Sequence, residues 1–245
     1  MRKLALPFAF ALATFVLLCW LAAWQLERLA WKEGLLARIR ERATALPAPL
    51  PPPADWAALS PDAYDYRHVI ARGSFDPASE ALVFRGSGDG KPGAAGPGYL
   101  VLTPLHLAGG GTLIVNRGFV PLAKKNPADR AAGQVAGEVQ TTGLLRPPEP
   151  RNSFTPIDVP AAGEWYTRDP ALIAAHFALA DAAPFTLDAD AAPAPPGGLP
   201  QGGATVLDVP NNHLSYAVTW FGLALTLLGV FGVFAAGVVR RSSGS

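Results

Sequence analysis

Cysteine is almost absent from this sequence of 245 residues, in which Cys19 is the single example and lies inside a long apolar run. One thiol cannot build an internal disulfide framework or a thiolate metal site. An excess of one charge is absent too, because 20 Lys and Arg stand against 19 Asp and Glu, and this balance does not suggest a nucleic-acid partner. The sequence also lacks the GKS/T, GxSxG and HExxH motifs.

Two apolar runs without charge, Leu4–Trp24 and Leu214–Val239, are the most informative feature that is present. A helix that spans a bilayer needs about 20 apolar residues, and both runs meet that length. Basic residues lie at the outer end of each run, and the positive-inside rule therefore places both termini in the cytoplasm and the intervening chain outside it. These residues are Arg2, Lys3, Arg240 and Arg241.

A cleaved signal peptide is the alternative interpretation of the first run. Signal peptides have a shorter apolar core, of about 7–15 residues, followed by a small-residue cleavage site. Here the core runs into Trp20 and Trp24 without a polar region, and the sequence Ala22-Ala23-Trp24 is a poor cleavage site. The run is therefore predicted to be an uncleaved anchor.

The residues between the runs alternate short apolar segments with Gly and Pro, which is typical of a small β-rich domain. The predicted strands are 66–72, 81–84, 99–103, 112–119, 138–145, 184–187 and 205–209. One helix is predicted over 171–179, capped by Asp169 with Pro170 in its first turn. The Gly-rich segment 86–98 is interpreted as a mobile hairpin loop, and 190–203 as a second flexible stretch.

These patterns predict a membrane protein with two transmembrane helices flanking a β-rich (α+β) periplasmic domain. The expected divisions are a first transmembrane helix over 1–24, a helical extension and Pro-rich linker over 25–53, and the domain over 54–209. A second transmembrane helix is expected over 210–239, followed by a cytoplasmic tail over 240–245.

Four histidines are present, and His213 is set apart by its position. His68, His106 and His176 are interpreted as ordinary surface or core residues of the domain. His213 follows Asn211 and Asn212, either of which can cap a helix, and so it falls in the first turn of the second span. The positive end of the helix dipole and an apolar environment both favour the neutral imidazole, which has a ring nitrogen free for a metal.

The residues that follow His213 give its helix face an aromatic character. Tyr216, Ala217 and Trp220 recur at the third, fourth and seventh positions after it, so the four residues share one helical face. The sequence therefore predicts a metal-binding face, with simple anchoring of the helix at the lipid headgroups as the alternative.

Eight motifs in order show that the chain resembles the Surfeit locus protein 1 family of cytochrome c oxidase assembly factors, and its bacterial members in particular. They are WQLERLAWK (24–32), RGSFD (72–76), GYLVLTPL (98–105), VNRGFVP (115–121), NPADR (126–130), GEVQTTGLLRPPEPRNSFTP (137–156), WYTRD (165–169) and NNHLSYAVTWFGLA (211–224). The chain departs from the family at 157–164, where many members have an Asn-rich segment.

The resemblance implies a non-enzymatic assembly factor in the bacterial cell inner membrane. Its implied partners are subunit I of the oxidase, the lipid bilayer and the machinery of haem a synthesis, and its implied cofactor is haem a, held transiently. The histidine of the second-span motif, here His213, is implied as an axial ligand of the haem iron.

Further haem contacts follow from this implied role. Tyr216, Trp220 and Trp24 are expected to pack on the porphyrin, and Arg28 and Arg117 to pair with its propionates, because guanidinium matches carboxylate geometry. Headgroup contact is the alternative for Arg28, and an ion pair inside the domain is the alternative for Arg117. Two other functions stay open: a scaffold that binds oxidase subunits without haem, and a membrane-anchored periplasmic enzyme.

Overall fold

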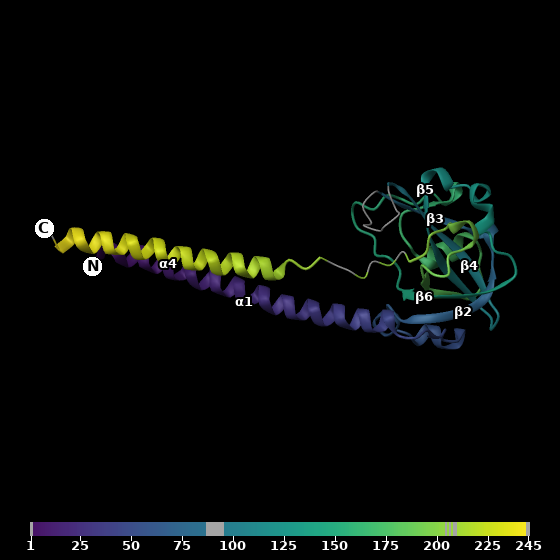
Figure 1. Ribbon diagram of the computed structural model, residues 1–245, viewed down its shortest axis with the longest axis horizontal. Coiled ribbons are helices and arrows are strands. Elements are labelled where there is room, and N and C mark those ends of the chain that lie inside the picture. Colours follow the sequence, from purple (N-terminus) through teal and green to yellow (C-terminus); the bar gives the residue numbers. More distant parts are fainter. Residues whose placement is uncertain (1, 87–95, 204, 206, 208–209, 244–245) are drawn as a thin grey trace. The chain divides into compact units, whose positions relative to one another are not determined.

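The computed structural model describes residues 2–86, 96–203, 205, 207 and 210–243. Contacts divide the chain into two compact units, Met1–Arg38 with Asp208–Ser245, and Ile39–Leu207. The first unit contains most of helix α1 (Arg2–Thr44) and all of helix α4 (His213–Ser243), and the second contains the strands (Figure 1).

Both long helices are apolar and long enough to be candidate membrane spans. Helix α1 continues without a break through the segment 25–44, as the sequence predicts for the extension of the first span. Helix α4 begins at His213, as predicted from the pair of asparagines before it. Leucines and phenylalanines along both helices are exposed on their outer sides, which suits contact with lipid acyl chains.

The second unit is built from eight strands and several short helices. The strands are β1 (Ala48–Pro49), β2 (His68–Phe75), β3 (Ala81–Arg85), β4 (Gly98–Leu107), β5 (Thr112–Pro121), β6 (Glu138–Arg146), β7 (Glu164–Trp165) and β8 (Ala182–Ala189). The α-helices are α2 (Pro61–Tyr64) and α3 (Pro170–His176), and the 3₁₀ helices are η1 (Pro53–Ala58), η2 (Pro77–Ser79), η3 (Leu122–Lys124), η4 (Pro127–Gly133), η5 (Pro160–Ala162) and η6 (Pro196–Gly198).

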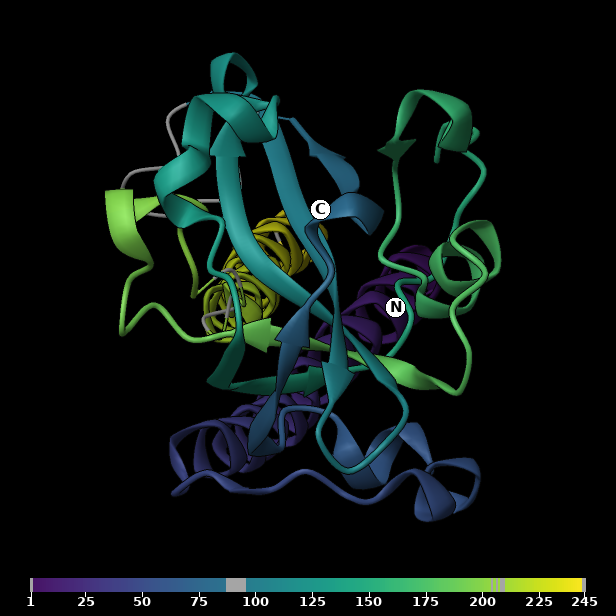
Figure 2. The ribbon, with the colours of Figure 1, turned by 90° about the vertical axis from the view of Figure 1, so that its right-hand side faces the viewer.

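Five of the strands close into a barrel, in the order β2, β6, β8, β5, β4 and back to β2 (Figure 2). Strand β4 makes the closure possible because it pairs with β3 along its first half and with β2 at Leu105–Leu107. The β5–β8 pair is parallel, and the other pairs of the barrel are antiparallel. Closure leaves these five strands without a free edge.

An apolar core fills the barrel. It is built by inward-facing residues of every barrel strand, among them Val69, Leu105, Val115, Leu145 and Leu187. The side chains of Trp56 and Tyr64 close one end by packing on Phe185, with ring centroids 5.7 and 5.0 Å from it. The core is built without a disulfide, since Cys19 is the single cysteine of the sequence and lies in α1.

A second core lies outside the barrel, beneath α3. Ile173 and Trp165 pack there on Val83, Leu102 and Ile114. Strands β4 and β5 are therefore buried on both faces, which explains their nearly continuous apolar sequences. The predicted cap of α3 is confirmed, because the Asp169 side chain accepts hydrogen bonds from two backbone amides of the first turn.

The Pro-rich segment that the sequence suggested was a linker is packed on the barrel. Its Ala48 and Pro49 form β1 alongside β2, and the carbonyl of Pro51 accepts a 2.8 Å hydrogen bond from the indole of Trp56. Proline is tolerated there because β1 is an edge strand, which does not need every backbone donor.

Three predictions remain, for the loop 86–98, the strand 205–209 and the flexible stretch 190–203. The predicted Gly-rich loop 86–98 lies mostly outside the described residues, as does part of the predicted strand 205–209; Thr205 and Leu207 are described and are not in a strand. The stretch 190–203, expected to be flexible, is joined to β5 at Gln201, whose backbone amide and carbonyl both bond to Phe119 at 2.9 Å.

Candidate functional site

The helix pair of the first unit packs along a regular seam. Buried or half-buried residues alternate at spacings of four and three along both helices, which is the heptad pattern of helices that cross at a shallow angle. In α1 these residues are Ala11, Phe15, Leu18, Ala22, Gln25, Leu29 and Lys32, and in α4 they are His213, Ala217, Trp220, Ala224, Leu227 and Phe231. The alanines at 22, 217 and 224 are at most 2% exposed, so small side chains let the two helices approach closely.

A polar contact interrupts this seam at the start of α4. The Nδ1 atom of His213 lies 2.7 Å from the side-chain oxygen of Gln25, which is itself buried. The side chain of Asn211 caps the helix by accepting a 3.4 Å hydrogen bond from the backbone amide of His213. Lys32 donates a 2.5 Å hydrogen bond to the carbonyl of Pro210, which ties the entry to α4 to helix α1.

These contacts leave the second ring nitrogen of His213 available. The structure shows no protein partner for Nε2 among the described residues. Within the same residues, no group of three or more His, Cys, Asp and Glu side chains is placed to hold a bare metal ion. His213 therefore suits a metal that already has most of its ligands, and a metal in a macrocycle fits this description.

The other predicted residues of this unit lie around the seam. Trp220 is half-buried, whereas Tyr216 and Trp24 are exposed on the outer sides of their helices, at 55% and 46%. The predicted helical face is thus divided, with Ala217 facing α1 and Tyr216 turned away from it. The guanidinium of Arg28 stacks on the ring of Trp31 at 3.8 Å.

Farther along the same helix pair, a small apolar pocket of 160 Å³ opens between α1 and α4. Its lining is entirely hydrophobic: Phe8, Ala11, Leu12, Phe15, Leu227, Leu228 and Phe231. Phe8 and Phe231 approach with ring centroids 6.0 Å apart. The pocket can accept a hydrocarbon chain but offers no polar group to a ligand.

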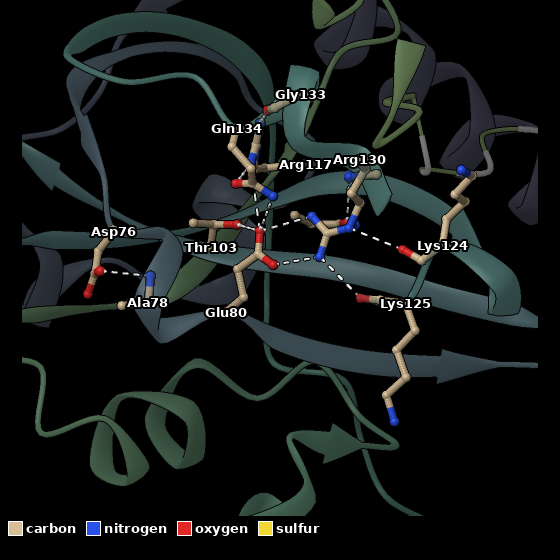
Figure 3. Close-up of polar contacts among 12 residues, drawn as sticks. Asp76, Ala78, Glu80, Thr103, Arg117, Lys124, Lys125, Arg130, Gly133 and Gln134 are labelled. Atoms are coloured by element: carbon tan, nitrogen blue, oxygen red, sulfur yellow. Dashed lines mark hydrogen bonds and ion pairs between the residues drawn. The ribbon is translucent and has the colours of Figure 1, made fainter. Parts of the chain in front are cut away.

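Arg117, the remaining predicted residue, belongs to the domain. The β4–β5 ladder shifts register at Val101 and Leu102, and Arg117 is the extra residue of that bulge. Bulges re-aim side chains, and this one directs Arg117 into a buried cluster around Glu80. Its Nη1 lies 3.7 Å from Glu80 and 3.4 Å from the side chain of Gln134, and its Nη2 donates to the carbonyl of Gly133 (Figure 3).

The electrostatics of this cluster follow from two guanidiniums sharing one carboxylate. Arg130 pairs with Glu80 as well, and its side chain is fully buried. Burial lowers the pKa of Arg117, Glu80 opposes that change, and the positive charge of Arg130 adds to it. The phenyl ring of Phe75 lies 4.8 Å from the Arg117 guanidinium and covers it further. Arg117 was expected to pair with a haem propionate, with an ion pair inside the domain as the alternative. The structure contains that internal ion pair, with Glu80.

A second buried polar cluster was missed by the sequence reasoning. The carboxylate of Asp188 on β8 accepts hydrogen bonds from Arg168 at 2.5 Å, Thr205 at 2.6 Å and Asn116 at 2.9 Å. Burial raises the pKa of Asp188, but Arg168 and these hydrogen bonds outweigh burial and leave the pKa below its usual range. The cluster joins β5, β8 and the segment before α3, so its role is to hold the fold.

The domain histidines are engaged in similar local contacts. His68 uses both ring nitrogens, one toward the carbonyl of Ala45 at 2.8 Å and one toward Asp190 at 2.9 Å. His106 is exposed and lies 3.4 Å from the hydroxyl of Thr112. The ring of His176 packs against Trp165 and Phe177. All three side chains thus contact other residues of the domain.

Comparisons with known proteins bear on the whole chain. Residues 12–225 match the model of the SURF1 family. The chain is 39% identical to mouse Surfeit locus protein 1 over 213 residues, covering 83% of this chain and 67% of that protein. It is 38% identical to human Surfeit locus protein 1 over 215 residues, with coverage of 83% and 69%. A SURF1-like protein of Monosiga brevicollis is 38% identical over 236 residues, with coverage of 92% and 84%.

Proposed function

This chain belongs to the SURF1 family, and from that membership we propose that it is an assembly factor for haem–copper cytochrome c oxidase, which binds haem a and aids its insertion into subunit I. The observation that carries the proposal is the arrangement of His213. Its Nδ1 is held by Gln25 and its Nε2 is free of protein partners among the described residues. A neutral imidazole in that state is a good ligand for haem iron.

The residues around His213 suit a haem with a long hydrocarbon tail. The unit is a pair of apolar helices, so the tail and the porphyrin edge can lie against hydrophobic side chains. Trp24, Tyr216 and Trp220 offer aromatic surface near the same end of the pair. Arg28 is exposed there and can pair with a propionate, since its guanidinium stacks on Trp31 without a carboxylate partner among the described residues. We assign Arg117 to the fold and not to the haem, because Glu80 and Gly133 occupy it.

A single histidine is also appropriate for a cargo. In this assignment His213 would be the one residue of this chain that binds the iron. Transfer then requires the loss of one bond to this chain. A site with two protein ligands would retain the haem more strongly and release it more slowly.

The proposed location is the bacterial inner membrane, with the domain in the periplasm and both termini in the cytoplasm. The support is the pair of candidate spans and the basic residues at their outer ends. In this topology the start of α4, and with it His213, lies at the periplasmic boundary of the bilayer. Haem delivered there can enter subunit I from within the membrane.

His213→Ala tests the proposal in protein co-expressed with the enzymes of haem a synthesis. Alanine is a good helix former, so the variant should insert and accumulate normally while losing most of its haem a. His106→Ala, at an exposed position of the domain, is the control and should keep the pigment. A full haem a spectrum with an unchanged Soret band in the His213→Ala protein would show that another residue binds the iron.

A scaffold that docks oxidase subunits without haem is the second candidate. The observation that favours it is an exposed apolar loop of the domain, in which Phe154 is 94% and Ile157 is 86% exposed. Side chains of this kind commonly mark protein contacts. The two functions separate in one experiment, because a pure scaffold would mature the oxidase normally with His213→Ala and would fail with Phe154→Ser.

A further inference from the structure

We propose that Gln25 is the positioning residue for His213: it fixes the imidazole in the tautomer with its proton on Nδ1, so that Nε2 is the atom that binds iron. The role of Nε2 rests on the proposed function, whereas the tautomer does not. The two ring nitrogens of a histidine are distinct, and the hydrogen bond made by one decides what the other can do. The Gln25 contact therefore determines the chemistry of the site as well as its shape.

The identity of the Gln25 atom decides which partner donates the hydrogen bond. The atom of Gln25 that faces His213 is the side-chain oxygen, which accepts hydrogen bonds and cannot donate them. With that oxygen as its partner at 2.7 Å, we infer that Nδ1 donates the hydrogen bond and carries the proton. In a neutral imidazole the lone pair is then on Nε2, where a metal can bind.

The geometry of the helix seam keeps Gln25 in this position. Gln25 is 9% exposed. Ala22 lies one turn before it on α1, Ala217 lies one turn after His213 on α4, and both alanines have almost no exposed surface. Larger residues at these positions would separate the helices and take the amide out of reach. The Lys32 contact to Pro210 fixes the start of α4 against α1 a second time, on the other side of Gln25 along α1. The imidazole is thus oriented before any ligand arrives.

The choice of an amide, and not a carboxylate, suits a site that releases its ligand. A carboxylate next to a metal-bound histidine raises the basicity of the ring and strengthens its bond to the metal. The neutral amide orients the ring in the same way while adding no charge. Gln25 therefore provides orientation with a weaker hold on the iron than Glu would give.

The first test measures the tautomer without haem. The chain has four histidines, so ¹⁵N spectra of the histidine-labelled full-length protein in micelles are simple, and His213→Ala assigns the signal of His213. We expect the wild-type His213 to carry its proton on Nδ1, and Gln25→Leu to shift it toward the Nε2-protonated form that dominates in free histidine. A His213 signal that is the same in Gln25→Leu and wild-type protein would overturn the proposal.

The second test compares haem a binding among three variants in full-length protein. Removal of a group that orients a metal ligand costs about 10- to 100-fold in affinity, and we expect this loss for Gln25→Leu. Gln25→Glu should bind haem at least as tightly as wild type and lower its midpoint potential, because a carboxylate favours the more positive ferric iron. Glu27→Leu, at an exposed position two residues away on α1, is the matched control and should change neither property.

The two tests separate this inference from the proposed function. If His213→Ala keeps its haem but Gln25→Leu changes the tautomer, the proposed iron ligand is wrong and the orientation by Gln25 stands. If His213→Ala loses its haem and Gln25→Leu binds haem with wild-type affinity and potential, His213 is the ligand and the role of Gln25 is refuted.

Discussion

Glu80 binds Arg130 through both of its carboxylate oxygens: Nη1 of Arg130 donates to Oε1 at 3.1 Å and Nη2 donates to Oε2 at 2.6 Å (Figure 3). Arg117 approaches the same carboxylate from β5, and the hydroxyl of Thr103 lies 3.4 Å from it. The side chains of all three charged residues are at most 6% exposed. Glu80 directly precedes β3, so its carboxylate connects the start of β3 to the bulge in β5 through Arg117 and to helix η4 through Arg130.

Glu80→Gln keeps the shape of this side chain and removes its charge, which leaves two buried guanidiniums without an acid. Breaking a buried ion pair from one side costs about 3–5 kcal/mol, so the variant should unfold about 10 °C below wild type. Thermal unfolding of the full-length protein, followed by near-ultraviolet circular dichroism, measures this change.

The matched control is Glu164→Gln, which removes a more exposed pair with Lys125. Surface pairs contribute about 0–1 kcal/mol, so this variant should stay within a few degrees of wild type. Equal losses in the two variants would mean that the charge of Glu80 has no special role.

Asp188→Asn should make stability less sensitive to acid. Arg168 and the hydrogen bonds hold the pKa of Asp188 below its usual range despite burial, so the folded protein binds this proton less readily than the unfolded chain. A lowered pKa stabilises the fold above the unfolded value of about 3.9 and ceases to do so as the pH falls through the folded value. The stability gap between wild type and Asp188→Asn should therefore be about 3–5 kcal/mol at pH 7 and narrow below about pH 4. Urea unfolding across this pH range measures the gap; a gap that stays constant with pH would contradict the prediction.

Gly118→Ala should destabilise the domain by a combination of strain and collision. Gly118 has φ of +122°, and an added Cβ would lie 2.0 Å from the carbonyl oxygen of Gln201. The backbone conformation alone costs a larger residue about 1–3 kcal/mol, and the collision adds to it by breaking the bridge between Phe119 and Gln201.

Gly137→Ala measures the cost of backbone strain without a steric collision. Gly137 has φ of +84°, but a Cβ added to it would meet no atom of the described residues within 4 Å. It should lose stability through backbone strain alone, so its unfolding temperature should lie between those of wild type and Gly118→Ala. The reverse order would exclude a collision at Gly118.

Reporter fusions test the topology. A fusion within the loop after β6, at residue 150, and a fusion at the C-terminus should report opposite compartments, because α4 is a candidate span between them. Alkaline phosphatase activity at 150 and a fluorescent protein at the C-terminus are the expected signals. Two fusions that report the same side would reject the two-span arrangement.

The helices of this protein are more predictable from sequence than its barrel. Long uncharged runs, Asp169 before α3 and Asn211 before α4 are local signals, and each marks the helix that the structure contains. Six of the seven predicted strands match strands that the structure contains, because Val, Ile, Leu and Phe dominate them. No local sequence pattern predicts the pairing of β2 with β4 that closes the barrel, because this pairing depends on the curvature of the whole sheet.

The candidate site was predictable in part for a similar reason. His213 is conspicuous as an imidazole at the start of an apolar helix, but Gln25 becomes meaningful only with the register of α1 against α4 known. A polar residue at a heptad position of the first span was the available signal. Arg117 could not be assigned from sequence, because the bulge that directs it toward Glu80 depends on pairing with β4.

Strand order also constrains when the domain can fold during synthesis. Strand β8 lies between β5 and β6 in the barrel although it is the last of them along the chain. Chains emerge from the ribosome and the translocon N-terminus first, so β5 and β6 wait with unpaired edges until β8 arrives. The contact between His68 and Asp190, 122 residues apart, illustrates how late the ring is completed. Since α4 follows soon after β8, the domain completes its fold only when the second span is about to enter the membrane, and a nascent chain halted before β8 would present two open edges to aggregation.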